Sequence, residues 1–297
     1  MKKRYIYVIA LCISCATATA QTISLEFPYF AGNTYEFKIV QGNKHIVLQK
    51  DTIPKGGNVQ LKIPLKYKGY KGMAMWYITN SATGGGLEMV INNEDFSVSC
   101  LDSIPSTKNI IYTNSPENIF LKSSSQEQQA LFAKHDAMLA ATKAYTDKNS
   151  RLYRVFNKEY TRVLKAYNKY AKKLQDTNLY AARFREITNL TMGIGSIITQ
   201  DENIKAKNIN MIIVHQLDFE ALFTSNHWGG VLNTWVQLHV NVLKNDAQLI
   251  SDTTTILKRI TSGIVYSQFL ISLTKALKKA GKETVITAVT EELMSEK

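Results

Sequence analysis

The pattern of apolar and polar positions changes once along the chain, near Lys122. Before this point apolar residues alternate with polar ones, as in Tyr35, Phe37 and Ile39, and the runs are separated by turn residues such as Gly42-Asn43. A period of two places every second side chain on the same face of a strand. The region predicts about seven short strands, and this spacing is typical of an antiparallel β-sandwich.

From Ser123 onward the apolar period becomes helical, and proline is absent after Pro116. The expected helices span residues 126–145, 150–175, 179–198, 202–217, 231–249, 253–262, 264–280 and 283–295. We expect Asp201 and Asp252 to be N-caps, Gly281 to follow a helix end, and residues 114–125 to form a linker. The sequence therefore predicts an α+β chain, with an N-terminal antiparallel β-sandwich (21–122) followed by an all-α helical domain (123–297).

The first 20 residues have the features of a secretory signal peptide. Three basic residues precede an apolar run from Tyr5 to Cys15, and Ala18-Thr19-Ala20 supplies small residues for cleavage. We expect cleavage after Ala20 and a periplasmic or secreted mature chain. No later apolar run reaches the length of about 18 residues that spans a bilayer, so we expect no stable membrane insertion once the signal is removed.

The cysteines argue against a redox site in the mature chain. Cys12 and Cys15 have C-x-x-C spacing, which suits a redox dithiol, but they lie inside the predicted signal peptide. Only Cys100 would remain, and it continues the alternation of Phe96 and Val98, so we expect it to be buried and structural. A reactive or partner-linked thiol is the alternative.

The chain of 297 residues carries 36 Lys and Arg against 24 Asp and Glu, a net charge of +12. Its 45% hydrophobic content excludes a disordered chain and permits a sizeable core. Removing the signal leaves 33 basic residues, or +9. The segment from Lys134 to Arg185 contains 13 basic and 4 acidic residues, which is also +9, so the excess charge is concentrated there.

The helix expected over residues 150–175 carries two stripes on opposite faces. One stripe is apolar and aromatic, and the other is basic. Each basic position follows an apolar position by two residues, which is a rotation of about 200° around the helix, so the two stripes face opposite ways. The basic stripe gives the candidate partner-binding residues Arg154, Lys158, Arg162, Lys165, Lys169 and Lys172. It is either a solvated face or a surface for an acidic protein or polymer. Nucleic acid is not expected, because the aromatic residues lie opposite the basic ones and the chain is predicted to be exported.

No catalytic, cofactor-binding or metal-binding residues are predicted. The five histidines lack the spacing of a zinc site, and Met192-Gly193-Ile194-Gly195-Ser196 is not a phosphate-binding loop, so we interpret it as close helix packing. His227 and Trp228 lie in a loop-like segment before Gly229-Gly230. They are candidate partner-binding residues, with a helix connection containing a packing tryptophan as the alternative.

Four segments resemble a known family: LEFPYF (residues 25–30), WYITNS (76–81), LYAARFRE (179–186) and TSNHWG (224–229). They are similar to the long N-terminal region of secreted bacterial TlpA/ResA-like proteins, which are often labelled alkyl hydroperoxide reductase or thiol-specific antioxidant proteins. The resemblance implies that a β-rich accessory domain and a helical region precede a thioredoxin domain with a W-C-x-x-C motif. This chain has no Trp-Cys pair, so the family's catalytic residues map onto no position here.

These observations favour an exported, non-catalytic accessory or binding module of a thioredoxin-like thiol–disulfide system. It would position a thioredoxin-fold domain or a client, and we expect no enzymatic activity from this chain alone. The alternative is that it is the N-terminal part of a complete thiol–disulfide oxidoreductase or peroxidase whose dithiol lies beyond residue 297. A further alternative is an independent envelope protein that binds an anionic glycan or peptide.

Overall fold

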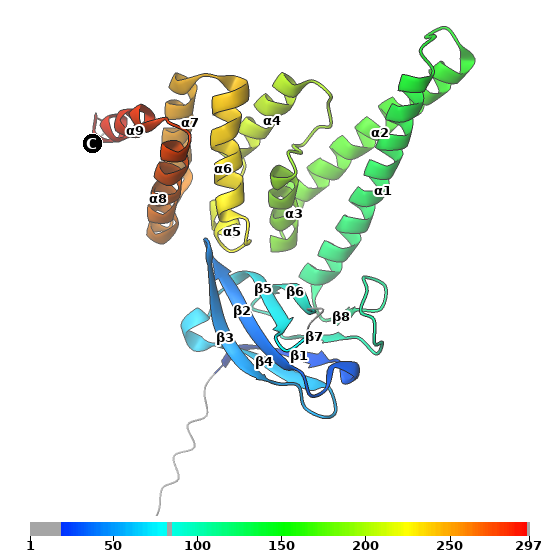
Figure 1. Cartoon of the computed structure of the whole chain (residues 1–297), viewed down its shortest axis with the longest axis vertical. Coiled ribbons are helices and arrows are strands. Elements are labelled where there is room, and N and C mark those ends of the chain that lie inside the picture. Colours follow the sequence, from blue (N-terminus) through cyan, green and yellow to red (C-terminus); the bar gives the residue numbers. More distant parts are fainter. Residues whose placement is uncertain (1–18, 82–84, 296–297) are drawn as a thin grey trace, which may run out of the picture.

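The structure, a computed structural model, describes residues 19–81 and 85–295. Apart from positions 19 and 20, the predicted signal peptide lies outside the described residues. Strands occupy the N-terminal part and helices the remainder, which confirms the expected α+β fold class (Figure 1).

Two four-stranded sheets form the N-terminal part. The first has the order β4 (Asn58–Pro64), β1 (Thr19–Glu26), β7 (Phe96–Ser99) and β8 (Ile111–Thr113). The second has the order β3 (Lys44–Thr52), β2 (Thr34–Gln41), β5 (Lys71–Ile78) and β6 (Gly86–Asn92). The pairs are antiparallel except β1–β7, which is parallel, so the predicted antiparallel sandwich contains one parallel pair.

The sandwich core is built from the alternating positions. Tyr35, Phe37 and Ile39 are all buried, and Trp76 on β5 lies with its ring centroid 5.1 Å from that of Phe27. Each large apolar side chain buried in this way stabilises the fold by about 1.5–3 kcal/mol relative to its exposed state. The period-two pattern therefore identified the inner faces of these strands.

Helices make up the rest of the chain. They are α1 (Pro116–Ala144), α2 (Arg151–Asp176), α3 (Tyr180–Thr191), α4 (Glu202–His215), α5 (Phe219–Phe223), α6 (Trp228–Leu238), the π-helical turn His239–Leu243, α7 (Asp246–Arg259), α8 (Gly263–Lys279) and α9 (Glu283–Ser295). The expected cap at Asp201 is confirmed, because its carboxylate accepts the N–H of Asn203 at 2.9 Å. Gly281 follows α8 with φ +66°, also as expected.

Several sequence expectations about the helices are wrong. Residues 114–125 are not a linker, because Ser115 caps α1 and Pro116 is well suited to the first turn, where its missing N–H costs nothing. The helix expected over 179–198 stops at Thr191, because Gly193 adopts a left-handed φ of +68°. The helix expected over 231–249 breaks at Lys244, which has φ +51°.

Because the helix breaks at Lys244, the next helix begins earlier than expected and has a different N-cap residue. Asn245 caps α7 by accepting the N–H of Gln248 at 3.0 Å, so Asp252 lies inside that helix and is not an N-cap. The carboxylate of Asp252 instead accepts a hydrogen bond from the Asn210 amide at 2.7 Å.

Backbone hydrogen bonds join the sandwich to the helices. The N–H of Met73 on β5 donates to Thr224 O at 2.9 Å, and the N–H of Gly42 donates to Phe223 O at 2.6 Å. On β6, both the N–H and the C=O of Val90 bond the Asn118 amide. Since buried backbone groups bond across this junction, the two parts are held in one arrangement.

The helices α1 and α2 form a long antiparallel hairpin that projects from the rest of the molecule (Figure 1). We call this hairpin the arm. Near its base, Tyr167 and Tyr170 are buried against the body of the protein. Toward the tip, Leu152 of the apolar stripe is 47% exposed, and Val155, which lies beside the stripe, is 55% exposed. The outer part of α2 therefore carries apolar surface that the rest of the protein does not cover.

Candidate functional site

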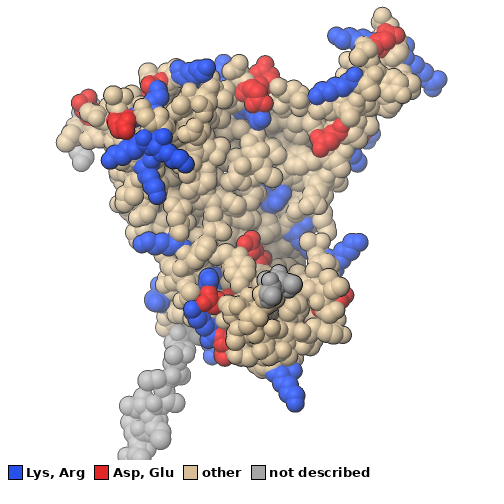
Figure 2. Space-filling view, in the orientation of Figure 1, with Lys and Arg blue, Asp and Glu red and all other residues tan. Residues whose placement is uncertain are grey.

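The basic stripe lies where the sequence predicted, on the solvent side of α2. All of its members are exposed: Arg154, Lys158, Arg162, Lys165, Lys169 and Lys172. The opposite face of the helix carries the buried Val163, Tyr167 and Tyr170. Figure 2 shows basic side chains around the projecting end of the arm, with a few acidic ones among them.

Few acidic residues neutralise this stripe. Arg162 lies 3.5 Å from Glu159, and Lys172 lies 3.0 Å from Asp176. The other four stripe residues form no ion pair with any residue that the structure describes. Both observed pairs are exposed, and exposed pairs contribute only about 0–1 kcal/mol each. The stripe therefore keeps most of its positive charge available to a partner.

An open groove of about 1060 Å³ runs beside the stripe on the outer part of the arm. Its apolar lining comes from Met138 on α1 and from Val155 and Phe156 on α2, and its basic lining includes Arg162 and Lys165. The acidic Glu159, which pairs with Arg162, also lines the groove, so three basic residues there face one acidic residue. Apolar surface with a charged rim is typical of a protein-binding surface.

Ring contacts hold the outer part of the arm together, and each joins a residue on or just after α1 to a residue on α2. The rings of Tyr145 and Phe156 lie 5.2 Å apart near the tip, and those of His135 and Tyr160 lie 5.4 Å apart further down. These contacts fix the spacing of the helices without using Val155. The groove is therefore bordered by two helices held against each other, and Val155 stays exposed within it, whereas Met138 and Phe156 are partly buried.

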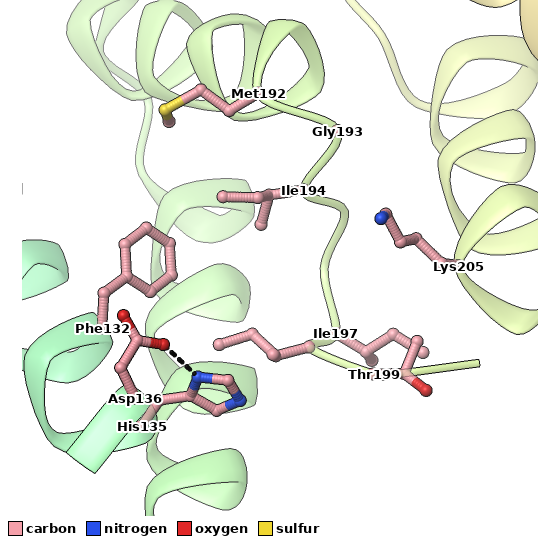
Figure 3. Close-up of a pocket in the computed structure, with 10 residues that line it drawn as sticks. Phe132, His135, Asp136, Met192, Gly193, Ile194, Ile197, Thr199 and Lys205 are labelled. Carbon is pink, nitrogen blue, oxygen red and sulfur yellow. Dashed lines mark hydrogen bonds and ion pairs between the residues drawn. The ribbon is translucent and has the colours of Figure 1, made fainter. Parts of the chain in front are cut away.

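A separate pocket of about 300 Å³ lies between the middle of α1, the α3–α4 loop and α4 (Figure 3). Phe132 on α1 and Ile194 and Ile197 on the loop form apolar walls, and Lys205 reaches in from α4 on the side opposite α1. The sequence pattern around the glycine-flanked Ile194 predicts close helix packing and gives no indication of this pocket.

Specific hydrogen bonds hold the loop wall of this pocket. Tyr167 Oη donates to Gly195 O at 2.9 Å, and the N–H of Ser196 donates to Asn208 Oδ1 at 2.9 Å. A Cβ atom at Gly195 would lie 1.9 Å from that Asn208 oxygen, so glycine is required for this close approach. The sequence feature that could have indicated this loop is the pair Gly193 and Gly195 within an isoleucine-rich segment.

His135 is the polar group most enclosed at this pocket, with 6% of its surface exposed. Its Nδ1 lies 2.9 Å from Asp136 Oδ1, whereas Nε2 is buried and has no hydrogen-bond partner among the described residues. Among the described residues, no hydroxyl or thiol group forms a hydrogen bond with His135. Most of the lining is apolar, which suits a small apolar group.

The other two candidate residues lie at the junction with the sandwich. Trp228 is 1% exposed, and its indole N–H donates to Ser272 Oγ at 2.9 Å, so it offers no surface to a partner. The half-buried ring of His227 lies 5.6 Å from that of Phe184. Burial lowers the pKa of His227, although Glu88 acts in the opposite direction. The structure does not bring either residue to the basic stripe.

Cys100 is buried, as expected, with 1% of its surface exposed. Its Sγ lies 3.6 Å from Asp102 O and 3.7 Å from Asn109 Oδ1. Cys12 and Cys15 lie outside the described residues. The thiol of Cys100 is therefore enclosed by its own strand end and the loop that follows it.

The described ranges hold no group of three or more His, Cys, Asp and Glu side chains that could bind a metal ion. Within those same ranges, none of the helices has both the length and the apolar character needed to cross a membrane.

Comparison with known proteins finds no family model, no curated protein and no solved structure that matches the chain. The resemblance to the TlpA/ResA-like N-terminal region therefore remains a prediction from the four sequence segments.

Proposed function

We propose that this protein is an exported, non-catalytic binding module that holds an acidic partner protein on the projecting arm. The observation that carries the proposal is the combination of an exposed, largely unpaired basic stripe with an apolar groove on the same helix pair. A solvated helix face does not need exposed apolar residues beside it. An amphipathic acidic segment would cover Val155 and place its carboxylates near Lys158 and Lys165.

The sequence resemblance makes a thioredoxin-fold domain the first partner to test. In that setting the arm positions the redox domain or its client, and the thiol chemistry belongs to the partner. A chain whose described part contains a single, buried cysteine is consistent with a binding role. The partner's recognition depends on acidic surface charge and an apolar contact, which are properties that a binding assay can vary separately.

The experiment measures fluorescence anisotropy of a labelled peptide that is helical, acidic on one face and leucine-rich on the other. A variant with Arg154, Lys158, Lys165 and Lys169 all changed to Gln is compared with a control that changes Lys55, Lys68, Lys71 and Lys108 to Gln. Both sets are exposed and remove the same charge. At about 0.2–1 kcal/mol per exposed pair, the arm variant should bind roughly 10-fold more weakly or worse.

A second variant tests the groove. Val155→Ser removes exposed apolar surface from the groove without changing the charge of the arm. We expect it to weaken peptide binding, whereas Ile271→Ser on α8, which is similarly exposed and distant from the arm in the chain, should not. The proposal is refuted if the four-glutamine variant of the arm and the four-glutamine control, whose changes lie in the sandwich region, weaken peptide binding equally.

A further inference from the structure

A second pocket of about 300 Å³ lies where α6, α8 and the turn between β2 and β3 meet. Its polar lining consists of Asn43 from the turn, Asn233 from α6, and Ser272, Lys275 and Lys279 from α8. No acidic residue lines it. The pocket shares no residue with the arm, so it is independent of the function proposed above.

Neighbouring hydrogen bonds leave donors, rather than acceptors, available on two of these side chains. Asn43 Oδ1 accepts the N–H of Gly229 at 3.2 Å, which leaves the amide NH₂ free to donate. Ser272 Oγ accepts the indole N–H of the buried Trp228 at 2.9 Å, which leaves its O–H free to donate. Neither group donates to another residue that the structure describes.

The two lysines add uncompensated positive charge to these donors. Lys275 and Lys279 are four residues apart on α8, and both are exposed. Like charges at this spacing repel each other. Neither lysine has an ion pair within the described ranges, whereas the nearby Lys282 pairs with Asp246 at 2.7 Å. Figure 2 shows basic side chains gathered over the end of the molecule formed by α8 and α9, with acidic side chains beside them.

We propose that this pocket binds an oxyanion group, a carboxylate or a phosphoryl group carried by a compact polar molecule. Two ammonium groups, the Asn43 amide and the Ser272 hydroxyl are all hydrogen-bond donors. They match a ligand that has a negative charge and several acceptor oxygens. The volume lies at the lower end of the range for small-molecule sites, which favours a compact ligand. Because Asn43 belongs to the sandwich and Lys275 to the helices, such a ligand bridges the two parts of the protein.

The test measures binding of two probes to the full chain by isothermal titration calorimetry: inorganic phosphate and glucuronate. The test variant is Lys275→Gln/Lys279→Gln, and the matched control is Lys278→Gln, an exposed lysine on the same helix that does not line the pocket. We expect saturable binding of at least one probe to the wild type, a loss of roughly tenfold or more in the double variant, and no change in the control. Circular dichroism checks that each variant is folded.

The choice of probe identifies the source of the oxyanion. Binding of phosphate alone indicates a phosphorylated ligand, and binding of glucuronate alone indicates an acidic sugar or another carboxylate. Because the site joins two parts of the fold, the bound probe should also raise the unfolding temperature of the wild type. The inference is overturned if neither probe saturates below about 10 mM, or if Lys278→Gln weakens binding as much as the double variant does.

Discussion

The carboxylate of Glu117 on α1 accepts the backbone N–H of Ala181, at the start of α3, at 2.7 Å. It also accepts the N–H of Tyr180 at 3.1 Å and a hydrogen bond from the Asn92 amide at 2.6 Å. Leu179, the residue before α3, provides no side-chain cap of its own. A buried glutamate from the base of the arm therefore caps a helix of the body and bonds the sandwich.

Loss of this carboxylate should destabilise the whole chain. Glu117→Ala leaves two buried backbone N–H groups and one amide without an acceptor, and each unsatisfied buried group costs about 1–3 kcal/mol. We expect the free energy of unfolding in urea to fall by at least about 2 kcal/mol. Glu127→Gln, which removes an exposed ion pair with Lys173, should change it by less than about 1 kcal/mol. Equal midpoints for Glu117→Ala and wild type would disprove the structural role.

Two glycine substitutions should have opposite effects. Gly195→Ala places a methyl group against the Asn208 amide, so either the α3–α4 loop or this side chain must shift. Because Asn208 hydrogen-bonds Ser196, we expect a loss of about 1–3 kcal/mol. At Gly230, inside α6, an added Cβ meets no atom within 4 Å, so Gly230→Ala should stabilise by up to about 1 kcal/mol through helix propensity. Urea unfolding measures both, and a stabilising Gly195→Ala would contradict the packing described for this loop.

Burial should make the Cys100 thiol unreactive in the native protein. At 1% exposure it can meet a disulfide reagent only after local or global opening of the chain. In a chain that lacks residues 1–20, we expect Ellman's reagent to modify Cys100 at least about 100-fold more slowly under native conditions than in guanidinium chloride. Rapid native modification would favour the reactive-thiol alternative instead.

His239 should make stability depend on pH. Burial lowers its pKa below the ordinary 6.5, with Asp252 and Asp246 acting in the opposite direction. Below pH 6.5 the unfolded chain therefore binds a proton at this position more readily than the native chain does. The stability contributed by the neutral ring is complete above pH 6.5 and is lost as the pH falls through the folded pKa.

Substitution separates this contribution from those of other groups. His239→Gln should show a smaller loss of unfolding free energy between pH 7.5 and pH 5.5 than wild type, as measured in urea at both pH values. The exposed His215→Gln should follow the wild type. If His239→Gln loses as much stability as wild type over this range, the ring is not the cause.

The sequence predicted elements whose pattern is set locally. Tyr35, Phe37 and Ile39 follow the pleat of one strand, and the aromatic stripe of α2 follows one helical face, so both were identified. Residues 114–125 were misassigned because their Ser, Asn and Pro content is typical of a loop, although the same residues suit a capped helix start. The break at Lys244 had no glycine or proline to indicate it.

The candidate sites also differ in whether they depend on one element or on several distant segments. The basic stripe depends on one helix and was predicted residue by residue. Both pockets of about 300 Å³ require residues that are distant in sequence, such as Asn43 with Lys275, or His135 with Ile197. Single-sequence periodicity carries no information about which helices become neighbours, and for that reason the pockets were found only in the structure.

The salt dependence of acidic-peptide binding tests the proposed role of the arm most directly. Screening shortens the range of charge interactions from about 30 Å at 0.01 M salt to about 3 Å at 1 M. The account predicts that the dissociation constant of the wild type rises roughly tenfold or more between 0.05 M and 0.5 M sodium chloride, and that the four-glutamine arm variant changes much less. The same weak salt dependence in both proteins would contradict a charge-based docking surface on α2.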